Sequence, residues 1–216
     1  MSAAFLVLGI DEAGRGPIVG PMVIAGFALP AARLGELDAL GARDSKKLSP
    51  KRRAAIGAAL RALEGAVIVE EVVPPAEIDA AVRNRSITLN GLELMKMAAI
   101  IERVGPAEAY LDMLGTSEER FQASLSRLLE SPCRILAANC GDDRFPVCAA
   151  ASIIAKTRRD AEIARLNEIH EPRYGPIGSG YPGDPKTRAF LAAAHAEPGI
   201  FRRSWSSFAA QDAERS

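Results

Sequence analysis

Residues 5–28, FLVLGIDEAGRGPIVGPMVIAGFA, hold two apolar runs on either side of a glycine-rich connection. The first run, residues 5–10, is rich in Leu, Val and Ile and predicts a buried strand. The second run, residues 18–28, predicts another strand, which Gly and Pro interrupt. The tight segment at residues 14–17 between the two runs favours a hairpin.

Apolar spacing and capping residues predict the remaining elements. Further strands are expected at residues 66–73, 107–113 and 134–138. Helices are expected after Ser49-Pro50, at 88–103, after the capping box at 116–119, at 149–169 and at 186–196. A loop is expected at 172–185 and an irregular tail at the end. This order predicts an α/β fold, a mixed five-stranded sheet flanked by helices with a helical C-terminal extension. We expect a catalytic domain at 1–170 and, at 171–216, the extension with a substrate-recognition loop.

The chain has 216 residues, 48% apolar and 25% charged, the composition of a globular protein that can bury a core. The longest charge-free stretch, residues 16–32, is interrupted by Gly and Pro, so no membrane span is expected. The first residues lack the basic region of a secretory signal, and three cysteines without CxxC spacing favour a reducing compartment. A cytoplasmic protein is therefore expected.

Charge is balanced overall but clustered locally. With 27 basic and 27 acidic side chains, only a local basic patch can bind nucleic acid. Residues 43–53 hold six basic side chains and one acid, and Lys156, Arg158 and Arg159 form a second group. Each group fits either a phosphate-binding patch or an ordinary solvated face, and both interpretations stay open.

Acidic side chains accompany three of the predicted strands. Asp11 and Glu12 end the first strand; Asp112 lies in the fourth, and Asp142 and Asp143 follow the fifth. An isolated Asp–Glu pair is most simply a solvated strand end, and the two share one site only if the strand is bulged or finished there. Ligands gather at strand ends in open sheets, and carboxylates without His or Cys suit a hard cation. The set therefore predicts a Mg²⁺ or Mn²⁺ site.

Five motifs in order resemble the type 2 ribonuclease H family, ribonuclease HII. They are GIDEAGRGPIVG at 9–20, DSKKLS at 44–49, Leu111-Asp112, AASIIAKTRRD at 150–160 and GSGYP at 178–182. The region 86–97 and the tail Arg202-Arg203-Ser204-Trp205 look closer to the archaeal and eukaryotic branch. The resemblance extends from about residue 7 to residue 205, nearly the whole chain.

The resemblance implies a ribonuclease H-like fold and hydrolysis of the RNA strand of RNA–DNA hybrids. It also implies incision 5′ of ribonucleotides embedded in duplex DNA, leaving 3′-hydroxyl and 5′-phosphate ends. Two Mg²⁺ or Mn²⁺ ions would activate water and stabilise the leaving oxygen. The implied metal-binding and catalytic carboxylates are Asp11, Glu12, Asp112 and Asp142. Asp143 is the rival for the fourth position, and Cys140 stands where family members often carry Lys.

The resemblance also implies substrate contacts. Gly14, Arg15 and Gly16 would contact the 2′-hydroxyl of the ribonucleotide, and Tyr181 would pack against the next sugar. Phosphates would be held by Lys46, Ser152, Lys156 and Arg159. Without the resemblance, Ser152 and Lys156 fit helix surface or helix packing equally well, and Tyr181 fits a surface Tyr or a core plug.

Three other functions fit parts of the pattern. Another two-metal nuclease of the same superfamily would carry a similar carboxylate set, and a non-catalytic nucleic-acid-binding subunit would be expected to have lost one. A nucleotide phosphate loop at 14–20 is disfavoured because the Lys-Ser/Thr ending is missing. A monomer is expected, and residues 206–216 show no clear Gln-anchored aromatic motif for a sliding clamp.

Overall fold

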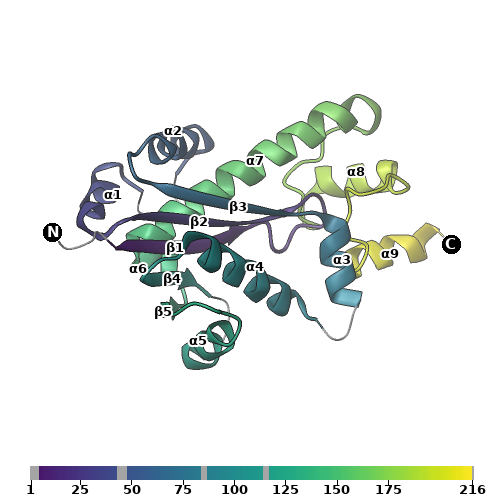
Figure 1. Ribbon diagram of the computed structural model, residues 1–216. Coiled ribbons are helices and arrows are strands. Elements are labelled where there is room, and N and C mark those ends of the chain that lie inside the picture. Colours follow the sequence, from purple (N-terminus) through teal and green to yellow (C-terminus); the bar gives the residue numbers. More distant parts are fainter. Residues whose placement is uncertain (1–4, 43–47, 84–86, 114–116, 216) are drawn as a thin grey trace. The chain divides into compact units, whose positions relative to one another are not determined.

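The computed structural model describes residues 5–42, 48–83, 87–113 and 117–215, with side chains as far as residue 210. Five strands form one sheet in the order β3-β2-β1-β4-β5 (Figure 1). Their bounds are Leu6–Ala13 for β1, Met22–Pro30 for β2, Val67–Val73 for β3, Glu108–Asp112 for β4 and Arg134–Ala138 for β5. β4 pairs in parallel with both β1 and β5. The mixed five-stranded sheet predicted from the sequence is confirmed.

The helices agree with most of the sequence prediction. Their bounds are Gly35–Ala39 for α1, Pro50–Arg61 for α2, Pro75–Arg83 for α3, Leu89–Val104 for α4, Glu118–Ser126 for α5, Gly141–Arg144 for α6, Pro146–Tyr174 for α7, Pro185–Ala194 for α8 and Ser206–Arg215 for α9, with a 3-10 turn at Ala31–Arg33. Ser49 caps α2 as predicted, by accepting the Arg52 N–H. For α5 the cap is Ser117, while the predicted Thr116 lies outside the described residues.

Two predictions about helices are wrong. The tail is not irregular, because it contains α9, and α7 continues through the residues assigned to the start of a loop, with Pro172 inside it. The helices α1, α3 and α6 were not predicted either. α1 has five residues and α6 has four, so helical periodicity is weak in both. α3 is different, because Ile78 and Ala81 lie on its buried face at helical spacing, a signal that was available in the sequence.

The chain divides into two compact units. The first comprises Met1–Ala13, Ile24–Glu71 and Glu93–Thr157, and the second comprises Gly14–Val23, Val72–Leu92 and Arg158–Ser216. The long helix α7 contributes its beginning to the first unit and its remainder to the second. The predicted domain division at residue 170 stays a prediction.

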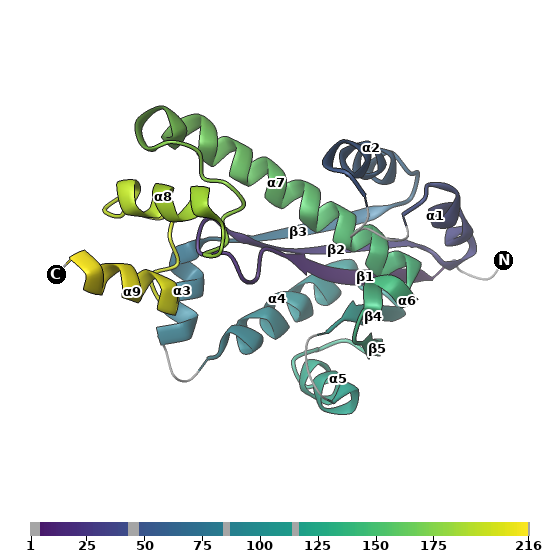
Figure 2. The ribbon, with the colours of Figure 1, turned by 180° about the vertical axis from the view of Figure 1, so that it is seen from behind.

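In the first unit, α4 covers one face of the sheet and α7 the other (Figures 1 and 2). Two glycines allow this close packing. A Cβ on Gly9 of β1 would lie 2.1 Å from the backbone carbon of Val147, and one on Gly26 of β2 would lie 2.5 Å from Ile100. The first turns of α7 therefore sit directly against β1, and this contact brings polar residues of α7 near the end of that strand.

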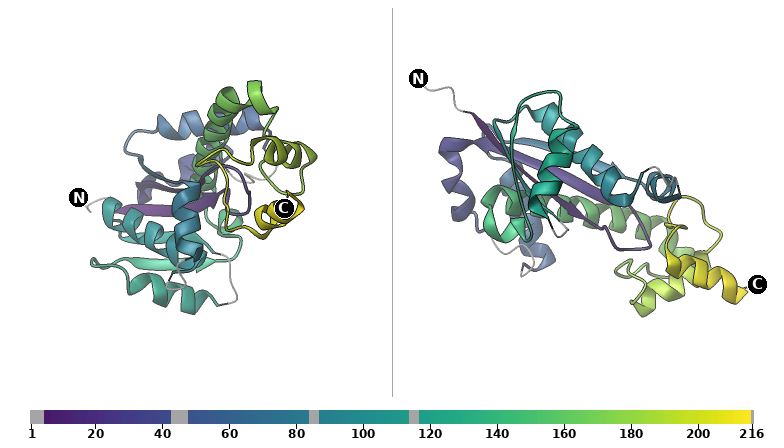
Figure 3. Two further views of the ribbon diagram at one scale, coloured as in Figure 1. Left: turned by 90° about the vertical axis from the view of Figure 1, so that its right-hand side faces the viewer. Right: turned by 90° about the horizontal axis from the view of Figure 1, so that it is seen from below.

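In the second unit, the end of α7, α8 and α9 lie close together (Figure 3), and their side chains contribute to an apolar core. Phe201 packs between Phe190 and Phe208, with ring centroids 5.8 Å apart in both pairs. Ile18 and Val19, from the connection after β1, belong to the same core. Burial of Phe208 explains why the polar tail forms a helix, since packing supplies the stability that local sequence lacks.

Within the described part of the chain, none of the helices has the length and apolar character needed to span a membrane.

Candidate active site

Three acidic side chains of the first unit converge, and we call Asp11, Asp112 and Asp142 the carboxylate cluster. Each offers a carboxylate oxygen, and these oxygens all lie within 4.8 Å of one another. Ile10 of β1 stands opposite Leu111 of β4, and the strands are parallel. Asp11 and Asp112, which follow this pair, therefore lie at the same edge of the sheet. Asp142 joins them from α6, after β5.

The glycine before Asp142 fixes its position. A Cβ on Gly141 would lie 2.7 Å from the carbonyl oxygen of Leu111, so a larger residue would force α6 away from β4. The Gly141 N–H donates to Oδ1 of Asp112 over 2.8 Å. Cys140, just before it, has a φ of 56°, which is uncommon for a residue with a Cβ. The start of α6 is thus fastened to the end of β4, and Asp142 is buried beside Asp112.

Asp11 is held by two side chains of α7. Ser152, which is fully buried, hydrogen-bonds the Asp11 carboxylate, and the Lys156 ammonium donates to Oγ of Ser152 over 2.7 Å. The Glu12 N–H donates to Oδ1 of Asp11 over 2.7 Å. Burial raises the pKa of Asp11 to about 7, and the charge of Asp112 adds to this rise. The contacts from Ser152, Lys156 and the Glu12 N–H oppose the rise without cancelling it.

The cluster offers oxygen ligands. Cys148 lies close to it, but burial, together with the nearby Asp charges, raises the pKa of this thiol well above its ordinary value. Carboxylate oxygens are the donors that Mg²⁺ and Mn²⁺ prefer. Among the described residues, Glu12 and Asp143 are not members of the cluster. Glu12 directly follows Asp11 on β1, where successive side chains alternate in direction, and Asp143 is exposed.

The second unit begins with Gly14, Arg15 and Gly16, which we call the glycine turn. Gly14 has a φ of 81°, and a Cβ there would lie 2.2 Å from Nε of Arg159. Both the backbone conformation and the space therefore require glycine. The Arg15 guanidinium donates to Oδ1 of Asn90, at the start of α4.

Tyr181 lies against the glycine turn. Its side chain is 48% exposed, and a Cβ on Gly16 would lie 3.3 Å from ring carbon Cε1. The loop that carries Tyr181 is fixed from within, since buried Thr187 accepts the Gly180 N–H over 3.0 Å. The Gly180 carbonyl accepts the N–H of Ile18 over 2.8 Å. Tyr181 is therefore an exposed ring on a fixed loop and not a core plug.

Arg159 occupies the space left by two glycines of the same unit. Besides its approach to Gly14, its Nη2 would lie 3.2 Å from a Cβ on Gly180. Nε and Nη2 are buried and have no hydrogen-bond partner among the described residues. Burial lowers the pKa of this guanidinium. Buried donors without partners are costly, so this site favours an added oxygen acceptor.

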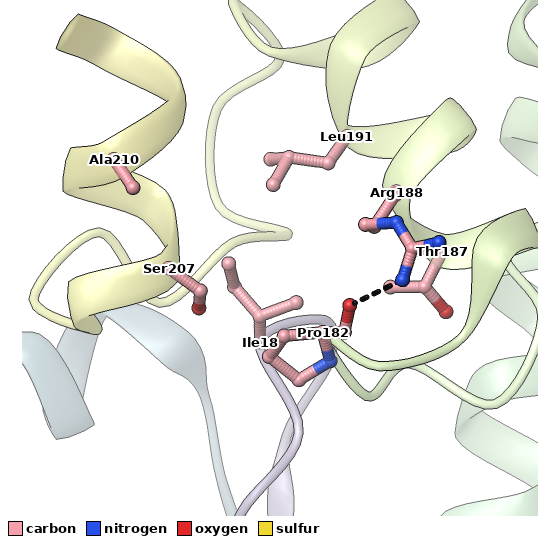
Figure 4. Close-up of a pocket in the computed structure, with 7 residues that line it drawn as sticks. All are labelled: Ile18, Pro182, Thr187, Arg188, Leu191, Ser207 and Ala210. Atoms are coloured by element: carbon pink, nitrogen blue, oxygen red, sulfur yellow. Dashed lines mark hydrogen bonds between the residues drawn. The ribbon is translucent and has the colours of Figure 1, made fainter.

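A separate cavity of about 260 Å³ lies in the second unit (Figure 4). Its lining comes from the connection after β1, the loop after Tyr181, α8 and α9. Arg188 closes one side by donating to the carbonyl of Pro182 over 3.4 Å. Of the predicted site residues that the structure describes, none lines this cavity.

The structure thus brings together the predicted ligands Asp11, Asp112 and Asp142, and places Ser152 and Lys156 beside them. Gly14 and Gly16 lie with Arg159 and Tyr181 in the second unit. The predicted Lys46 lies outside the described residues. Sequence reasoning missed the roles of Arg202 and Trp205, which hydrogen-bond the glycine turn. The sequence signal for these roles is the tail Arg202-Arg203-Ser204-Trp205, which by itself indicates only the branch of the family.

The sheet and the carboxylate cluster are typical of metal-dependent nucleases with a ribonuclease H-like fold. A sequence profile for Ribonuclease HII matches residues 8–208. The Ribonuclease HII of Thermococcus kodakarensis is 43% identical over 206 residues, which cover 92% of this chain and 86% of that protein. The chain belongs to the ribonuclease HII family, a family of metal-dependent endonucleases.

Comparison with solved structures supports the same fold and family. The ribonuclease H2 from Pyrococcus horikoshii OT3 superposes with a TM-score of 0.86 and 31% identity, covering 97% of this chain and 98% of that one. Ribonuclease HII in the PCNA:RNase HII complex from Archaeoglobus fulgidus superposes with a TM-score of 0.78 and 37% identity. That match covers 88% of this chain and 87% of the other. The predicted fold and family are confirmed.

Proposed function

We propose that this endonuclease hydrolyses the RNA strand of RNA–DNA hybrids and incises 5′ of ribonucleotides embedded in duplex DNA. It would use two divalent cations and leave 3′-hydroxyl and 5′-phosphate ends. The observation that carries the proposal is the carboxylate cluster, whose oxygens lie within 4.8 Å of one another. Membership of the ribonuclease HII family supports the choice of substrate.

The cluster residues fit a divalent cation. Burial is the main cause of the raised pKa of Asp11, and repulsion from the charge of Asp112 adds to it. A cation would relieve both costs. We propose that Asp11, Asp112 and Asp142 hold the cations and that Glu12 completes the set once substrate is present. When bound, the cations supply Lewis-acid stabilisation of the phosphate and lower the pKa of water.

The protein's own residues prepare this site. Ser152 and Lys156 orient the Asp11 carboxylate and favour its charged form, which a cation requires. We also propose that these two residues hold a phosphate of the substrate, as the resemblance implies. A phosphate bound by Lys156 would leave the positive charge of Lys156 close to Asp11. Gly141 orients Asp112 by donating to its carboxylate.

Substrate selection is assigned to the second unit. We place the 2′-hydroxyl of the target ribonucleotide on Gly14, Arg15 and Gly16, where the absence of side chains at the two glycines permits close approach. Tyr181 would stack on the following sugar, which its exposure allows. Arg159, with its buried Nε and Nη2, and Lys46 would hold phosphates.

One cleavage assay tests the proposal. The protein is incubated with a duplex that holds a single ribonucleotide, with a matched all-DNA duplex and with an RNA–DNA hybrid, each with and without Mg²⁺. We expect Mg²⁺-dependent cuts 5′ of the ribonucleotide and within the RNA strand, and none in DNA. Equal cleavage of the all-DNA duplex would favour a different two-metal nuclease, and binding without cleavage would favour a non-catalytic subunit.

Protein partners are a separate question from the nucleic-acid substrate. The Archaeoglobus fulgidus relative was solved in complex with PCNA. Residues 206–216 of this chain show no clear Gln-anchored aromatic motif, so we propose no sliding-clamp contact through this tail. We also propose that the enzyme is monomeric and cytoplasmic. Gel filtration with and without PCNA tests the partner and the oligomeric state together.

A further inference from the structure

Arg202 is a fully buried charged side chain of the second unit, at 0% exposure. Its guanidinium donates to backbone carbonyls of the segment that contains the glycine turn. Nη2 donates to Gly14 over 2.5 Å, Nη1 to Arg15 over 2.7 Å, and Nε and Nη2 to Gly20 over 3.2 and 3.1 Å. Burying a guanidinium is costly unless its donors are used, so the carbonyls must stay in place for Arg202 to be stable.

Trp205 acts on the third residue of the same turn. Its Nε1 donates to the Gly16 carbonyl over 3.1 Å, and the Arg202 guanidinium lies 5.2 Å from the centre of its ring. The carbonyls of Gly14, Arg15 and Gly16 are thus all bonded by two side chains from residues more than 180 positions away. We call these two side chains the Arg202–Trp205 pair.

The segment that carries the pair is itself held firmly. The buried Asp79 carboxylate of α3 accepts the N–H groups of Arg203 and Ser204, both over 2.9 Å, and the Ser204 hydroxyl over 2.6 Å. The Arg202 N–H donates to the carbonyl of Ile18 over 2.9 Å. The pair therefore acts on the turn from a fixed support.

Bonded carbonyls also set the direction of the amides in the turn. A trans peptide is planar, so the C=O of one residue and the N–H of the next point in opposite directions. With the carbonyls of Gly14 and Arg15 directed at Arg202, the N–H groups of Arg15 and Gly16 are directed away from it. Two successive N–H donors aimed outward are suited to an oxygen such as a hydroxyl.

We propose that the Arg202–Trp205 pair positions the glycine turn so that its amides recognise the ribose 2′-hydroxyl, which makes the pair a determinant of ribonucleotide specificity. The inference rests on the proposed function, because it assumes that the turn contacts the ribonucleotide. Neither residue is catalytic, since both act through the turn.

The test compares two affinities of the full-length protein without divalent cation, measured by fluorescence anisotropy. One duplex holds a single ribonucleotide and the other is all DNA. Trp205→Phe keeps a ring under Arg202 and removes only the bond to Gly16, so the preference for the ribonucleotide should fall roughly two- to tenfold. Arg202→Lys keeps the charge but loses the planar fork, and its loss should be larger. Affinity for all-DNA duplex should stay unchanged.

Tyr174→Phe is the matched control. It removes a hydrogen bond to Glu197, which is not part of the glycine turn, from a side chain that packs against the same apolar core as Trp205, and it should keep the full preference. Melting temperatures identify folded variants, and Trp205→Phe decides the test if Arg202→Lys does not fold. A folded Trp205→Phe variant with wild-type preference overturns the inference alone. A wild-type protein that neither prefers nor cleaves the ribonucleotide duplex overturns the proposed function as well.

Discussion

At Asp112 of the carboxylate cluster a side chain carries the proposed chemistry and a backbone N–H positions it, whereas in the glycine turn the backbone carries the contacts and the side chains of Arg202 and Trp205 position it. The Gly141 N–H orients the Asp112 carboxylate by donating a hydrogen bond to it. The carbonyls of the turn are set by Arg202 and Trp205. The difference teaches where substitutions should act: at the cluster the loss of one charge is decisive, while at the turn the loss of shape matters more.

The largest effect is expected from Asp112→Asn. Asn keeps the shape and an acceptor for the Gly141 N–H but removes the charge, so cation affinity should fall while the fold persists. Cleavage of the single-ribonucleotide duplex should drop about a thousandfold or more, because a cation contributes several kcal/mol to the transition state. Steady-state kinetics across a Mg²⁺ titration, with melting temperatures, check this. Near-normal turnover at saturating Mg²⁺ would remove Asp112 from the site.

Two adjacent acids give the next contrast. Asp142 is buried in the cluster and Asp143 is exposed. Asp142→Asn should lower cleavage about a hundredfold or more, and Asp143→Asn should stay within about twofold of wild type. The pair forms its own matched control, measured under the same Mg²⁺ titration. If Asp143→Asn is the inactive variant, the fourth ligand has been assigned one residue too early.

Stability should depend on pH through Asp11. Its pKa in the folded protein is raised to about 7, from the ordinary 3.8, mainly by burial. Without a cation, the folded protein keeps a proton on Asp11 that the unfolded chain releases above about pH 4. The contribution of protonated Asp11 to the free energy of unfolding is therefore fully present below about pH 4 and is lost as the pH rises to about 7. Relative to Asp11→Asn, the wild-type free energy of unfolding should fall by about 2–4 kcal/mol over this range.

Urea unfolding of both proteins in EDTA, from pH 4 to pH 8, measures this difference. Mg²⁺ should stabilise wild type more at pH 8 than at pH 5, because at low pH it must displace the proton. Parallel pH profiles for wild type and Asp11→Asn would show that the cluster does not disfavour the charged form of Asp11.

The two regions also differ in how far sequence predicts them. β5 was found at its predicted residues and β3 within one, because short apolar runs between turn residues leave few alternatives. The cluster was predictable because carboxylates at the ends of buried apolar strands are costly unless they are solvated, paired or bound to a cation. The residues alone do not separate Asp142 from Asp143. The family resemblance favours Asp142, and the structure places Asp142 in the cluster, where Gly141 fits closely against β4. The hydrogen bonds from Arg202 to the turn could not be predicted from local sequence patterns, because their acceptors lie at residues 14–20, far from Arg202 along the chain.

Among the residues proposed to contact the cations or the substrate, the smallest loss of cleavage is expected at Tyr181, whose ring lies beside Gly16 and which is 48% exposed. Stacking on a sugar or base contributes about 1–3 kcal/mol, so Tyr181→Ala should lose roughly 10- to 100-fold of cleavage on the single-ribonucleotide duplex. Tyr181→Phe keeps the ring and should retain most activity. Gly16→Ala places a methyl group 3.3 Å from the ring, in the turn that is proposed to approach the ribose closely, so it should also lower cleavage of this duplex. Gly183→Ala adds the same methyl group where no atom lies within 4 Å, so it should match wild type. A folded Tyr181→Ala variant that cuts this duplex as fast as wild type would show that the ring beside the turn does not contact the substrate.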